Sequence, residues 1–378
     1  MEYAQSSTKI YLSLGSNIGN RQEYLQNAIN LLFERIGAVL KISPVYETPA
    51  LGFEGEAFLN LVVIMTTEFA PAELMTELLS IEKQLGRERN SGVGYQSRTV
   101  DIDILFYGDE IIKSEDLMIP HREIQNRKFV LQPLNDIEPT KQHPGLEQSI
   151  ASLLVATFDD SLLKKTAISF QNPMNAFDFS KYNYIAIEGN IGAGKTSLTT
   201  KISSDFNAKL ILERFRDNPF LPKFYADPSR YAFPLEMSFL ADRYQQLVDD
   251  IAQLDLFQGW ILADYDVNKS LIFAGITLPE DEYSLYKKLF HVMHKDLPKP
   301  DLYVYLYQST ERLLENIKKR GREYEQSIPA DYLQKLNIGY LDYIKSRPSE
   351  NVRIIDITEI DFVRNRADYL KILRLIAK

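Results

Sequence analysis

A glycine-rich motif at the midpoint of the 378-residue chain constrains the fold more than any other feature. Residues 189–196 read GNIGAGKT and match the pattern G-x-x-x-x-G-K-[ST] at every fixed position. The apolar stretch YIAI precedes the motif and SLTTKI follows it, which predicts a strand, a loop and a helix. Such a loop usually follows the first strand of its domain. We therefore expect a second domain to begin near residue 183 and the preceding residues to fold separately.

The residue types in this motif are those that hold a nucleoside triphosphate. Glycines allow backbone angles that bring successive N–H groups around phosphate oxygens, and the N-terminus of the following helix favours anions. Lys195 reaches the terminal phosphates, and the Thr196 hydroxyl can ligate magnesium. A glycine-rich turn without a ligand is the alternative. The predicted ATP-binding residues are Gly189, Asn190, Gly192, Ala193, Gly194, Lys195, Thr196 and Ser197.

Composition places the chain among ordinary globular proteins and argues against several classes. It is 45% hydrophobic and 25% charged, and its length suggests two domains or more. The net charge of -9 argues against nucleic-acid binding, so acidic substrates need local arginines or backbone amides. No apolar run reaches the roughly 18 residues of a membrane span, no secretory signal is evident, and cysteine is absent. We expect a cytoplasmic protein without nucleic-acid or membrane partners.

Hydrophobic periodicity divides the chain into two domains joined by a linker. Residues 1–165 combine strands and helices in an order typical of an α+β domain. Periodicity then weakens while Pro, Asn and Ser accumulate, which places the linker at residues 166–182. Residues 183–378 alternate strands, such as DLYVYLY and RIIDI, with helical stretches, which predicts an α/β domain with a parallel sheet.

The second domain resembles the deoxynucleoside kinase family. The stretch IEGNIGAGKTSL is followed by LERF and later by KKRGREYE, and the resemblance covers residues 183–378. It implies that Glu213 takes the proton from the sugar 5′-hydroxyl before attack on the γ-phosphate. It also implies that Arg320 and Arg322 are lid arginines that clamp the transferring phosphoryl group. Without the resemblance, the alternative for Glu213 is a solvated charge at the end of a strand. The alternative for the two arginines is a cluster of basic residues on a solvent-exposed face of the protein.

Two departures from the family pattern bear on the substrate. Glu236 stands where animal members of the family place a base-reading glutamine, with Arg243 seven residues later. Both are predicted substrate-binding residues, although an ionised carboxylate accepts hydrogen bonds and cannot donate one. The stretch ADYDVNKS, residues 263–270, occupies the region of the family's Glu-Arg-Ser motif without those letters, and Asp264 is the expected acidic member that helps to hold magnesium. The bacterial character of this domain favours a purine deoxynucleoside.

The first domain contains a pair of aspartates on a predicted strand, in RTVDIDILFYG. Residues two apart on a strand point to the same face, so Asp101 and Asp103 project together while Ile102 enters the core. Two adjacent carboxylates repel each other unless cations bind them, which predicts a magnesium site completed by substrate phosphates. A polar, solvent-facing strand edge is the alternative.

The motifs around these aspartates resemble 6-hydroxymethyl-7,8-dihydropterin pyrophosphokinase. They are LSLGSNIGNR, SPVYETPALG, FLNLVV, LGRER, SRTVDIDILFYG, IPHREIQNRKFVLQPL and IEP, in order over residues 8–160. The resemblance implies a ferredoxin-like α+β fold, and transfer of a pyrophosphoryl group from ATP to the pterin hydroxymethyl group, with two magnesium ions. It implies that Asp101 and Asp103 ligate the metals, and that the pterin pocket is lined by Thr48, Pro49, Leu51, Phe58, Asn60 and Phe129. The implied triphosphate ligands are Arg87, Arg98, His121 and Arg127, with Glu82 in contact with ATP.

One loop departs from that family. Where members commonly read Arg-Trp-Gly-Pro-Arg, this chain has RNSGVGYQSR, with Tyr95 as the nearest aromatic. We expect the loop's closure over ATP to differ while the reaction class stays the same. The remaining histidines, His143, His291 and His294, are expected to be structural.

Together, these features predict a bifunctional enzyme that uses ATP and magnesium on two small-molecule substrates. We expect the two sites to work independently, and a homodimer formed through the kinase domain is expected by analogy. Two alternatives stay open for the second domain: a nucleotide-sensing module that regulates the first, and a kinase of nucleoside monophosphates.

Overall fold

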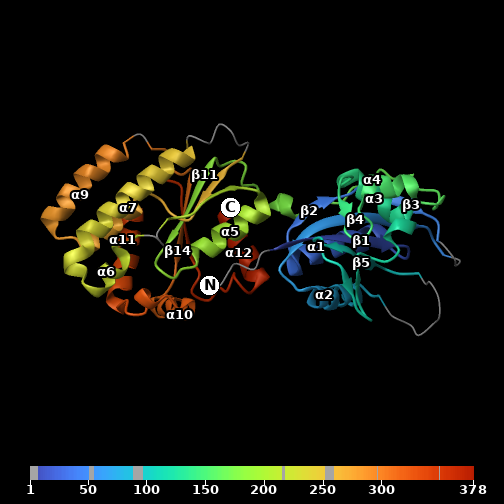
Figure 1. The fold of residues 1–378 in the computed structure, drawn as a ribbon, viewed down its shortest axis with the longest axis horizontal. Helices are drawn as coiled ribbons and strands as arrows, with labels where there is room; N and C mark the ends of the chain where they lie inside the picture. Colours follow the sequence, from blue (N-terminus) through green and yellow to red (C-terminus); the bar gives the residue numbers. More distant parts are fainter. Residues whose placement is uncertain are drawn as a thin grey trace. The chain divides into compact units, whose positions relative to one another are not determined.

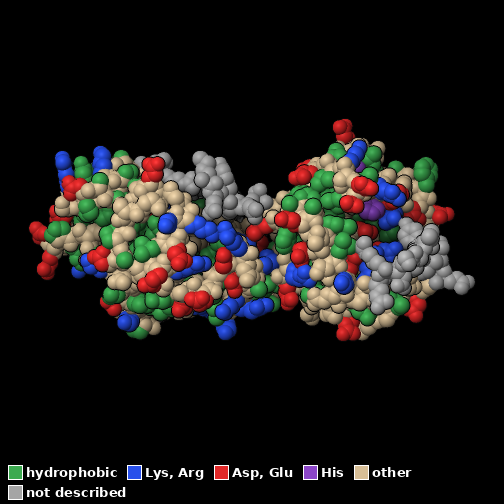
Figure 2. Space-filling model, turned by 90° about the horizontal axis from the view of Figure 1, so that it is seen from below, with side chains coloured by type: hydrophobic (Ala, Val, Ile, Leu, Met, Phe, Trp, Pro, Cys, Tyr) green, Lys and Arg blue, Asp and Glu red, His purple; other side chains and the backbone are tan. Residues whose placement is uncertain are grey.

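The computed structural model describes residues 7–50, 55–87, 97–214, 218–251, 259–295, 297–348 and 350–378. The chain forms two compact units, one ending at Phe177 and the other running from Asp178 to Lys378 (Figure 1). On the face shown in Figure 2, acidic and basic side chains are interspersed over both units. Among the described residues, we find no helix with the length and apolar character needed to cross a membrane.

The first unit is built on an antiparallel sheet with helices on both faces. Its strand order is β10-β3-β4-β1-β5, and β2 also pairs with β4. The central strands are buried along almost their whole length, because each face is covered by helices. The strands are β1 (Thr8–Ser16), β2 (Val39–Ile42), β3 (Tyr46–Thr48), β4 (Phe58–Thr67), β5 (Asp101–Tyr107) and β10 (Lys164–Lys165).

Side-chain alternation along these strands assigns the helices to the two faces. Helices α3 (Lys128–Ile137) and α4 (Ile150–Ala156) pack on a core that includes Tyr11, Val62 and Ile64. The alternate residues of β1 and β4 point to the opposite face, and α1 (Arg21–Arg35) and α2 (Pro71–Gln84) pack against each other and against the sheet. Helix α2 begins with Pro71, a residue favoured at the first helical position. Short elements complete the unit: β6 (Ile112–Lys113), β7 (Met118–Ile119), β8 (Gln142–His143), β9 (Gln148–Ser149), η1 (Ile124–Asn126) and η2 (Pro173–Ala176).

The beginning of the predicted linker, residues 166–182, is held on the first unit. The backbone N–H of Thr166 donates to the Val45 carbonyl (2.9 Å), and the Asn172 side chain donates to the Val39 carbonyl (2.9 Å). Phe177 packs against Phe33, with ring centroids 5.9 Å apart. These contacts place the junction between the two units at the end of this range, at residues 177 and 178.

The second unit is an α/β domain around a parallel sheet, as the sequence predicts. Its strand order is β12-β13-β11-β14-β15, and every pairing is parallel. Strand β11 lies in the centre and is buried throughout, because helices cover both faces. The strands are β11 (Tyr184–Gly189), β12 (Lys209–Ile211), β13 (Ile261–Ala263), β14 (Leu302–Tyr307) and β15 (Val352–Asp356).

Helices of this unit build two clusters of buried residues on one face of the sheet, because Ala186 of β11 lies opposite Tyr303 of β14. One cluster joins Ala186 of the central strand to Leu240 and Tyr286, and another joins Tyr305 to Tyr340. The helical elements are α5 (Lys195–Phe206), α6 (Leu221–Ala226), α7 (Pro228–Ile251), α8 (Lys269–Thr277), α9 (Glu280–Met293), α10 (Thr310–Arg320), η4 (Glu323–Glu325), α11 (Ala330–Lys345) and α12 (Arg366–Ala377). All five aromatic residues of the stretch 218–233 belong to or pack against the first cluster, as core residues do.

Candidate active sites

The glycine-rich loop connects β11 to α5 and has the backbone shape that its sequence predicts. Gly192 and Gly194 have φ angles of 86° and 80°, in the left-handed region that side chains rarely adopt. A Cβ atom at Gly194 would lie 2.8 Å from Cζ of Phe362, which is too close for two carbon atoms. Both glycines are therefore required by the local geometry.

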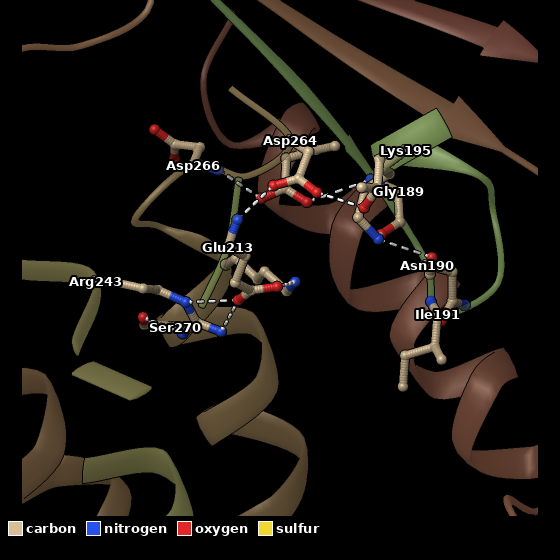
Figure 3. A network of polar contacts seen from close by, with 12 residues as sticks. Gly189, Asn190, Ile191, Lys195, Glu213, Arg243, Asp264, Asp266 and Ser270 are labelled. Carbon is tan, nitrogen blue, oxygen red and sulfur yellow. Dashed lines mark hydrogen bonds and ion pairs between the residues drawn. The ribbon is translucent and has the colours of Figure 1, made fainter. Parts of the chain in front are cut away.

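Two asparagines anchor this loop to neighbouring helices. The Asn190 side chain donates to the Leu333 carbonyl and to Oδ1 of Asn337, both on α11 and both at 2.8 Å. The Asn316 side chain on α10 donates to the Gly192 carbonyl at 2.9 Å. Lys195 lies over the loop, and its Nζ donates to the carbonyls of Gly189 (2.8 Å) and Asn190 (3.0 Å) (Figure 3). The loop thus presents a cation against a fixed backbone.

Asp264 connects the loop to the predicted catalytic glutamate. Its Oδ2 accepts a hydrogen bond from the Thr196 hydroxyl at 2.5 Å, and its Oδ1 accepts one from the backbone N–H of Glu213 at 2.7 Å (Figure 3). Burial raises the pKa of Asp264. A carboxylate beside the P-loop threonine is a suitable hard-oxygen partner for magnesium.

Glu213 follows β12 and lies in a buried cluster of charges. Its Oε1 accepts from Nε (2.9 Å) and Nη2 (2.6 Å) of Arg243, and its Oε2 accepts from Nζ of Lys269 at 2.6 Å (Figure 3). Burial by itself raises the pKa of Glu213, but Lys269 and Arg243 outweigh burial and hold that pKa well below its ordinary value. Glu213 is therefore an ionised, oriented carboxylate and not a solvated charge at a strand end.

The stretch 263–270, whose role the sequence leaves open, runs alongside this cluster. Lys269 contacts Glu213, and the Ser270 hydroxyl accepts from Nη1 of Arg243 at 2.6 Å. The backbone N–H of Asp266 donates to Oε1 of the buried Glu188 at 2.7 Å, directly before the loop. This stretch therefore supplies a cation, a hydroxyl and a backbone contact to the site.

The two predicted lid arginines converge on one glutamate. Arg320 ends α10, Arg322 follows Gly321, and both guanidinium groups pair with the carboxylate of Glu325. Nη1 of Arg322 lies 3.0 Å from Oε1 of Glu325, and the Glu325 side chain is almost fully buried. The structure brings Arg320 and Arg322 together on the Glu325 carboxylate, which orients both guanidinium groups.

In the first unit, the register of the strands aligns the predicted metal and pterin residues. Asp101 of β5 lies opposite Gly15 of β1, and Gly15 lies opposite Asn60 of β4. Directly opposed residues share a face of the sheet, and so do residues two apart on a strand. Asp101, Asp103 and Asn60 therefore project from one face, the face that α3 and α4 cover. Gly15 has no side chain, and Oδ1 of Asn60 lies 3.1 Å from the position that a Cβ atom would take there.

Thr48, Phe58 and Phe129 lie in the same neighbourhood. Thr48 of β3 is paired with Phe58 of β4, and its hydroxyl accepts from the Asn60 amide at 2.8 Å. The guanidinium of Arg127 lies 5.8 Å from the ring centroid of Phe129 at the start of α3. Pro49 is exposed. The predicted pocket residue Leu51 and the loop residue Tyr95 lie outside the described residues.

Arginines and a buried glutamate surround Asp101. Nη1 of Arg87 lies 2.5 Å from Oδ1 of Asp101, and Arg98 pairs with the other oxygen. Glu82 is 2% exposed, pairs with Arg87, and accepts from the Ile102 N–H at 2.8 Å. Burial raises the pKa of Glu82. The arginines expected to hold phosphates are thus held beside the carboxylates expected to hold metal.

Asp103 and His121 have pKa values displaced in opposite directions. Burial and the neighbouring Asp101 raise the pKa of Asp103 to about 6, although Arg127, 4.0 Å away, opposes the change. Burial and Arg127 lower the pKa of His121 to about 4, so this imidazole is neutral at pH 7. Its Nδ1 accepts from the Glu123 N–H at 3.2 Å. The raised pKa of Asp103 indicates a carboxylate pair that would be stabilised by added positive charge.

Among the residues that the structure describes, no group of three or more His, Asp or Glu side chains forms a metal centre. The pair Asp101 and Asp103 offers hard oxygen donors, which suit magnesium when phosphate oxygens complete its coordination. Thr196 and Asp264 offer a second set of this kind. His143, expected to be structural, accepts hydrogen bonds from the N–H groups of Gly145 and Leu146 in a turn.

Sequence reasoning missed three residues that shape the sites. Lys269 pairs with Glu213, Glu325 pairs with both lid arginines, and Asn316 contacts the glycine-rich loop. The only signal for Lys269 was a Lys-Ser pair in the region of the Glu-Arg-Ser motif. Glu325 lies three residues after Arg322, which is a helical spacing of an ion pair. Nothing in the sequence pointed to Asn316.

The comparisons with known proteins assign each unit to a family. The model of the family "Deoxynucleoside kinase" matches residues 185–378, and the model of "7,8-dihydro-6-hydroxymethylpterin-pyrophosphokinase (HPPK)" matches residues 11–139. A deoxyguanosine kinase of Bacillus subtilis is 42% identical over 50% of this chain and 93% of its own length. A 2-amino-4-hydroxy-6-hydroxymethyldihydropteridine pyrophosphokinase of Aquifex aeolicus is 43% identical over 36% of this chain and 83% of its own length. A solved deoxyadenosine kinase from M. mycoides is 25% identical, with a TM-score of 0.43, over 50% of this chain and 96% of that one.

The fold and the sites define a two-domain, ATP-dependent transferase. The chain belongs to the deoxynucleoside kinase family through its second unit and to the hydroxymethyldihydropterin pyrophosphokinase family through its first. It is a bifunctional enzyme, with a pyrophosphokinase of folate biosynthesis in one unit and a deoxynucleoside kinase in the other.

Proposed function

We propose that the second unit phosphorylates the 5′-hydroxyl of a purine deoxynucleoside, with Glu213 as the general base. The hydroxyl oxygen attacks the γ-phosphorus of ATP, the bond from this phosphorus to the β-phosphate oxygen breaks, and ADP leaves. The hydroxyl proton passes to Oε1 or Oε2 of Glu213. The observation that carries this proposal is the Glu213 carboxylate, ionised and held by Arg243 and Lys269, with its own N–H on the carboxylate that also binds Thr196 of the P-loop. The resemblance to a deoxyguanosine kinase supports the purine.

Lys195 and the loop N–H groups would hold the β- and γ-phosphates, while Arg320 and Arg322 would stabilise charge on the group in transfer. Both arginines are paired with Glu325, so they would exchange part of that pairing for phosphate oxygens when ATP binds. Thr196 and Asp264 would hold a magnesium ion, which supplies positive charge to the phosphates when it is bound.

For the first unit, we propose a ferredoxin-like α+β fold that brings ATP and the pterin to one face of its sheet. The order β1-α1-β2/β3-β4-α2-β5 and the antiparallel pairing support this fold. The hydroxymethyl oxygen attacks the β-phosphorus of ATP and loses its proton to water, the bond from this phosphorus to the α-phosphate oxygen breaks, and AMP leaves. Asp101 and Asp103 would hold magnesium, which neutralises phosphate charge when it is bound. Arg87, Arg98, Arg127 and the neutral His121 would contact the triphosphate.

The pterin would lie beside Asn60 and Thr48, between the rings of Phe58 and Phe129. The aligned register of Asp101, Gly15 and Asn60 supports this placement, because it puts the metal-binding and pterin-binding residues on one face of the sheet. Glu82 is engaged with Ile102 and Arg87. We therefore propose that Glu82 acts on ATP chiefly by positioning Arg87.

A cytoplasmic location and a homodimer are further expectations, and sedimentation velocity would test the homodimer.

A crossed assay tests both functions on the intact chain. Glu213→Gln should lower kcat for deoxynucleoside phosphorylation by about 10²–10⁴, the usual worth of a general base, and should leave pterin pyrophosphorylation unchanged. Asp101→Asn should do the reverse, with a loss on the order of 10² or more. All four deoxynucleosides and their monophosphates are offered as acceptors. If ³²P from γ-labelled ATP reached none of the deoxynucleosides, the kinase assignment would fail. Transfer only to monophosphates would identify a monophosphate kinase instead.

A further inference from the structure

Glu236 is a buried carboxyl group that the proposed phosphoryl transfer does not use. It lies on α7 and is 2% exposed. Its Oε1 accepts only a long hydrogen bond from the Thr277 hydroxyl (3.3 Å), and its Oε2 is buried without a hydrogen-bond partner among the described residues. A buried carboxyl oxygen without a partner is costly, so such an atom calls for an explanation, and an absent ligand is one.

The cationic groups near Glu236 donate their hydrogen bonds to other residues. Arg243 lies two turns further along α7, but its Nε and Nη2 donate to Glu213 and its Nη1 donates to Ser270. Lys269, which also acts on Glu236 through its charge, donates to Glu213. Burial has the largest effect on the pKa of Glu236 and raises it, while the positive charges of Arg243 and Lys269 lower it. Neither cation donates a hydrogen bond to Oε2 of Glu236.

Three tyrosines complete the surroundings. Tyr225 of α6, Tyr286 of α9 and Tyr332 of α11 all interact electrostatically with Glu236, and the Tyr286 hydroxyl donates to its backbone carbonyl at 3.3 Å. Aromatic rings around a carboxyl group that lies near the catalytic base form a suitable environment for a flat, hydrogen-bonding ligand.

We propose that the Glu236 carboxyl group reads the N1 edge of the acceptor's purine, and that its protonation state selects guanine over adenine. This inference rests on the proposed deoxynucleoside kinase function. An ionised carboxylate only accepts hydrogen bonds, so it matches the N1–H and exocyclic N2–H donors of guanine. Adenine offers one donor, N6–H, beside the acceptor N1. It therefore needs a protonated carboxyl group, which presents one acceptor and one O–H donor.

The pKa values of Glu236 and its neighbours allow the preference between guanine and adenine to change with pH near neutrality. Burial raises the pKa of Glu236 to about 7, so both forms are populated at that pH. The pKa values of Tyr225, Tyr286 and Tyr332 are raised by burial. That of Glu213 is lowered by its cations, although burial opposes the change. These neighbours therefore keep their charge between pH 6 and pH 8. Deprotonation of Glu236 as the pH rises then favours guanine and disfavours adenine.

The test is the ratio of kcat/KM for deoxyguanosine to that for deoxyadenosine, measured on the intact chain from pH 6 to pH 8. Groups that act on catalysis with either substrate cancel in this ratio, including Glu188 and Lys195, whose pKa values are displaced to about 7 and about 8. We expect the ratio to rise tenfold or more for the native chain, on the order expected for one bidentate base contact. In Glu236→Gln, whose amide always offers one donor and one acceptor, the ratio should be lower and independent of pH.

The control is Glu280→Gln, an exposed residue at the start of α9, which should reproduce the native ratio at every pH. Pterin pyrophosphorylation by the same preparations reports that each variant was produced intact, and thermal unfolding reports whether its kinase unit is folded. A pH-independent ratio in the native chain would overturn the inference while leaving the kinase function standing. A Glu236→Gln variant with the native ratio would do the same. If no deoxynucleoside is phosphorylated by the native chain, the proposed function itself fails.

Discussion

Lys269 shows how one side chain can set the state of a catalytic group. Its ammonium group donates to one oxygen of Glu213, and the guanidinium group of Arg243 donates to the other. Lys269 and Glu213 are both nearly buried, so their interaction is screened little by water. A base held in this way is ionised, and its oxygens point in fixed directions before the substrate arrives.

Replacing Lys269 by methionine should therefore damage both stability and catalysis. The loss of one partner from a buried ion pair costs about 3–5 kcal/mol when the remaining charge is left unpaired. The cost should be smaller here, because Arg243 still pairs with Glu213. Because the pKa of Glu213 is lowered on folding, its ionised carboxylate stabilises the folded state at pH values above 4.5, the ordinary pKa of this group. This stabilisation is lost as the pH falls through the lowered pKa. In Lys269→Met that pKa rises, so the acid limb of the kcat profile should move to higher pH.

Lys269→Arg is the matched control, since it retains the charge and can still donate to Oε2 of Glu213. Kinase pH profiles and the melting temperature of the kinase unit measure the two effects. An unshifted acid limb in Lys269→Met, with lower melting temperature, would show that Lys269 is structural only.

At the scale of elements, the glycine-rich loop depends on the helices that surround it. Asn190 connects it to α11, Asn316 connects it to α10, and Phe362 lies against Gly194. The motif specifies the turn, but residues more than 100 positions away hold that turn in place. A change in the loop should therefore disturb packing as well as phosphate binding.

Gly194→Ala should raise the KM for ATP by tenfold or more and lower the melting temperature of the kinase unit. The left-handed backbone costs alanine about 1–2 kcal/mol, and the added Cβ would also collide with Phe362 at 2.8 Å. Gly86→Ala separates the two effects. Its φ of 84° is similar, but the nearest neighbouring atom is 3.9 Å from the added Cβ, and it lies in the other unit. It should show the backbone cost alone. Equal destabilisation by both changes would contradict the role given to Phe362.

At the scale of the whole molecule, the chain consists of two units that each have their own sheet and core. The antiparallel sheet of the first packs against α3 and α4 and against α1 and α2, and the parallel sheet of the second packs against helices of the second unit. Each unit thus buries its own apolar surface, which is the condition for folding alone. The two ATP sites are also built differently: one from a glycine-rich loop, the other from strand carboxylates and arginines.

Residues 1–177 and 178–378, produced separately, should each fold and keep their activity within about twofold of the intact chain. A fragment ending at residue 165 is the matched comparison. It lacks the contacts of Thr166 with Val45, Asn172 with Val39 and Phe177 with Phe33, so it should melt at a lower temperature than 1–177. Melting curves and the two activity assays decide the outcome. A fragment that folds but has lost its activity would show that the sites depend on each other.

Several features of this protein follow from the sequence because they rest on local rules. The alternation of side chains along a strand places Asp101 and Asp103 on one face, and the glycine positions in GNIGAGKT predict the loop geometry. The parallel sheet of the second unit follows from the order of its strands and helices. The first two inferences need only neighbours within a few residues, and the third needs only the order of the elements along the chain.

Other features required the tertiary structure, because they depend on residues that are distant in the chain. Glu213 meets Arg243 and Lys269, 30 and 56 residues later, and only packing decides that all three are buried together. Whether Glu236 is solvated or enclosed could not be judged from FPLEMSFL, since its burial depends on α7 and on residues of α6, α8, α9 and α11. Local sequence determines which groups are present and in which direction a strand or turn presents them. Tertiary packing determines their surroundings, and hence their charge and the ligands that they can bind.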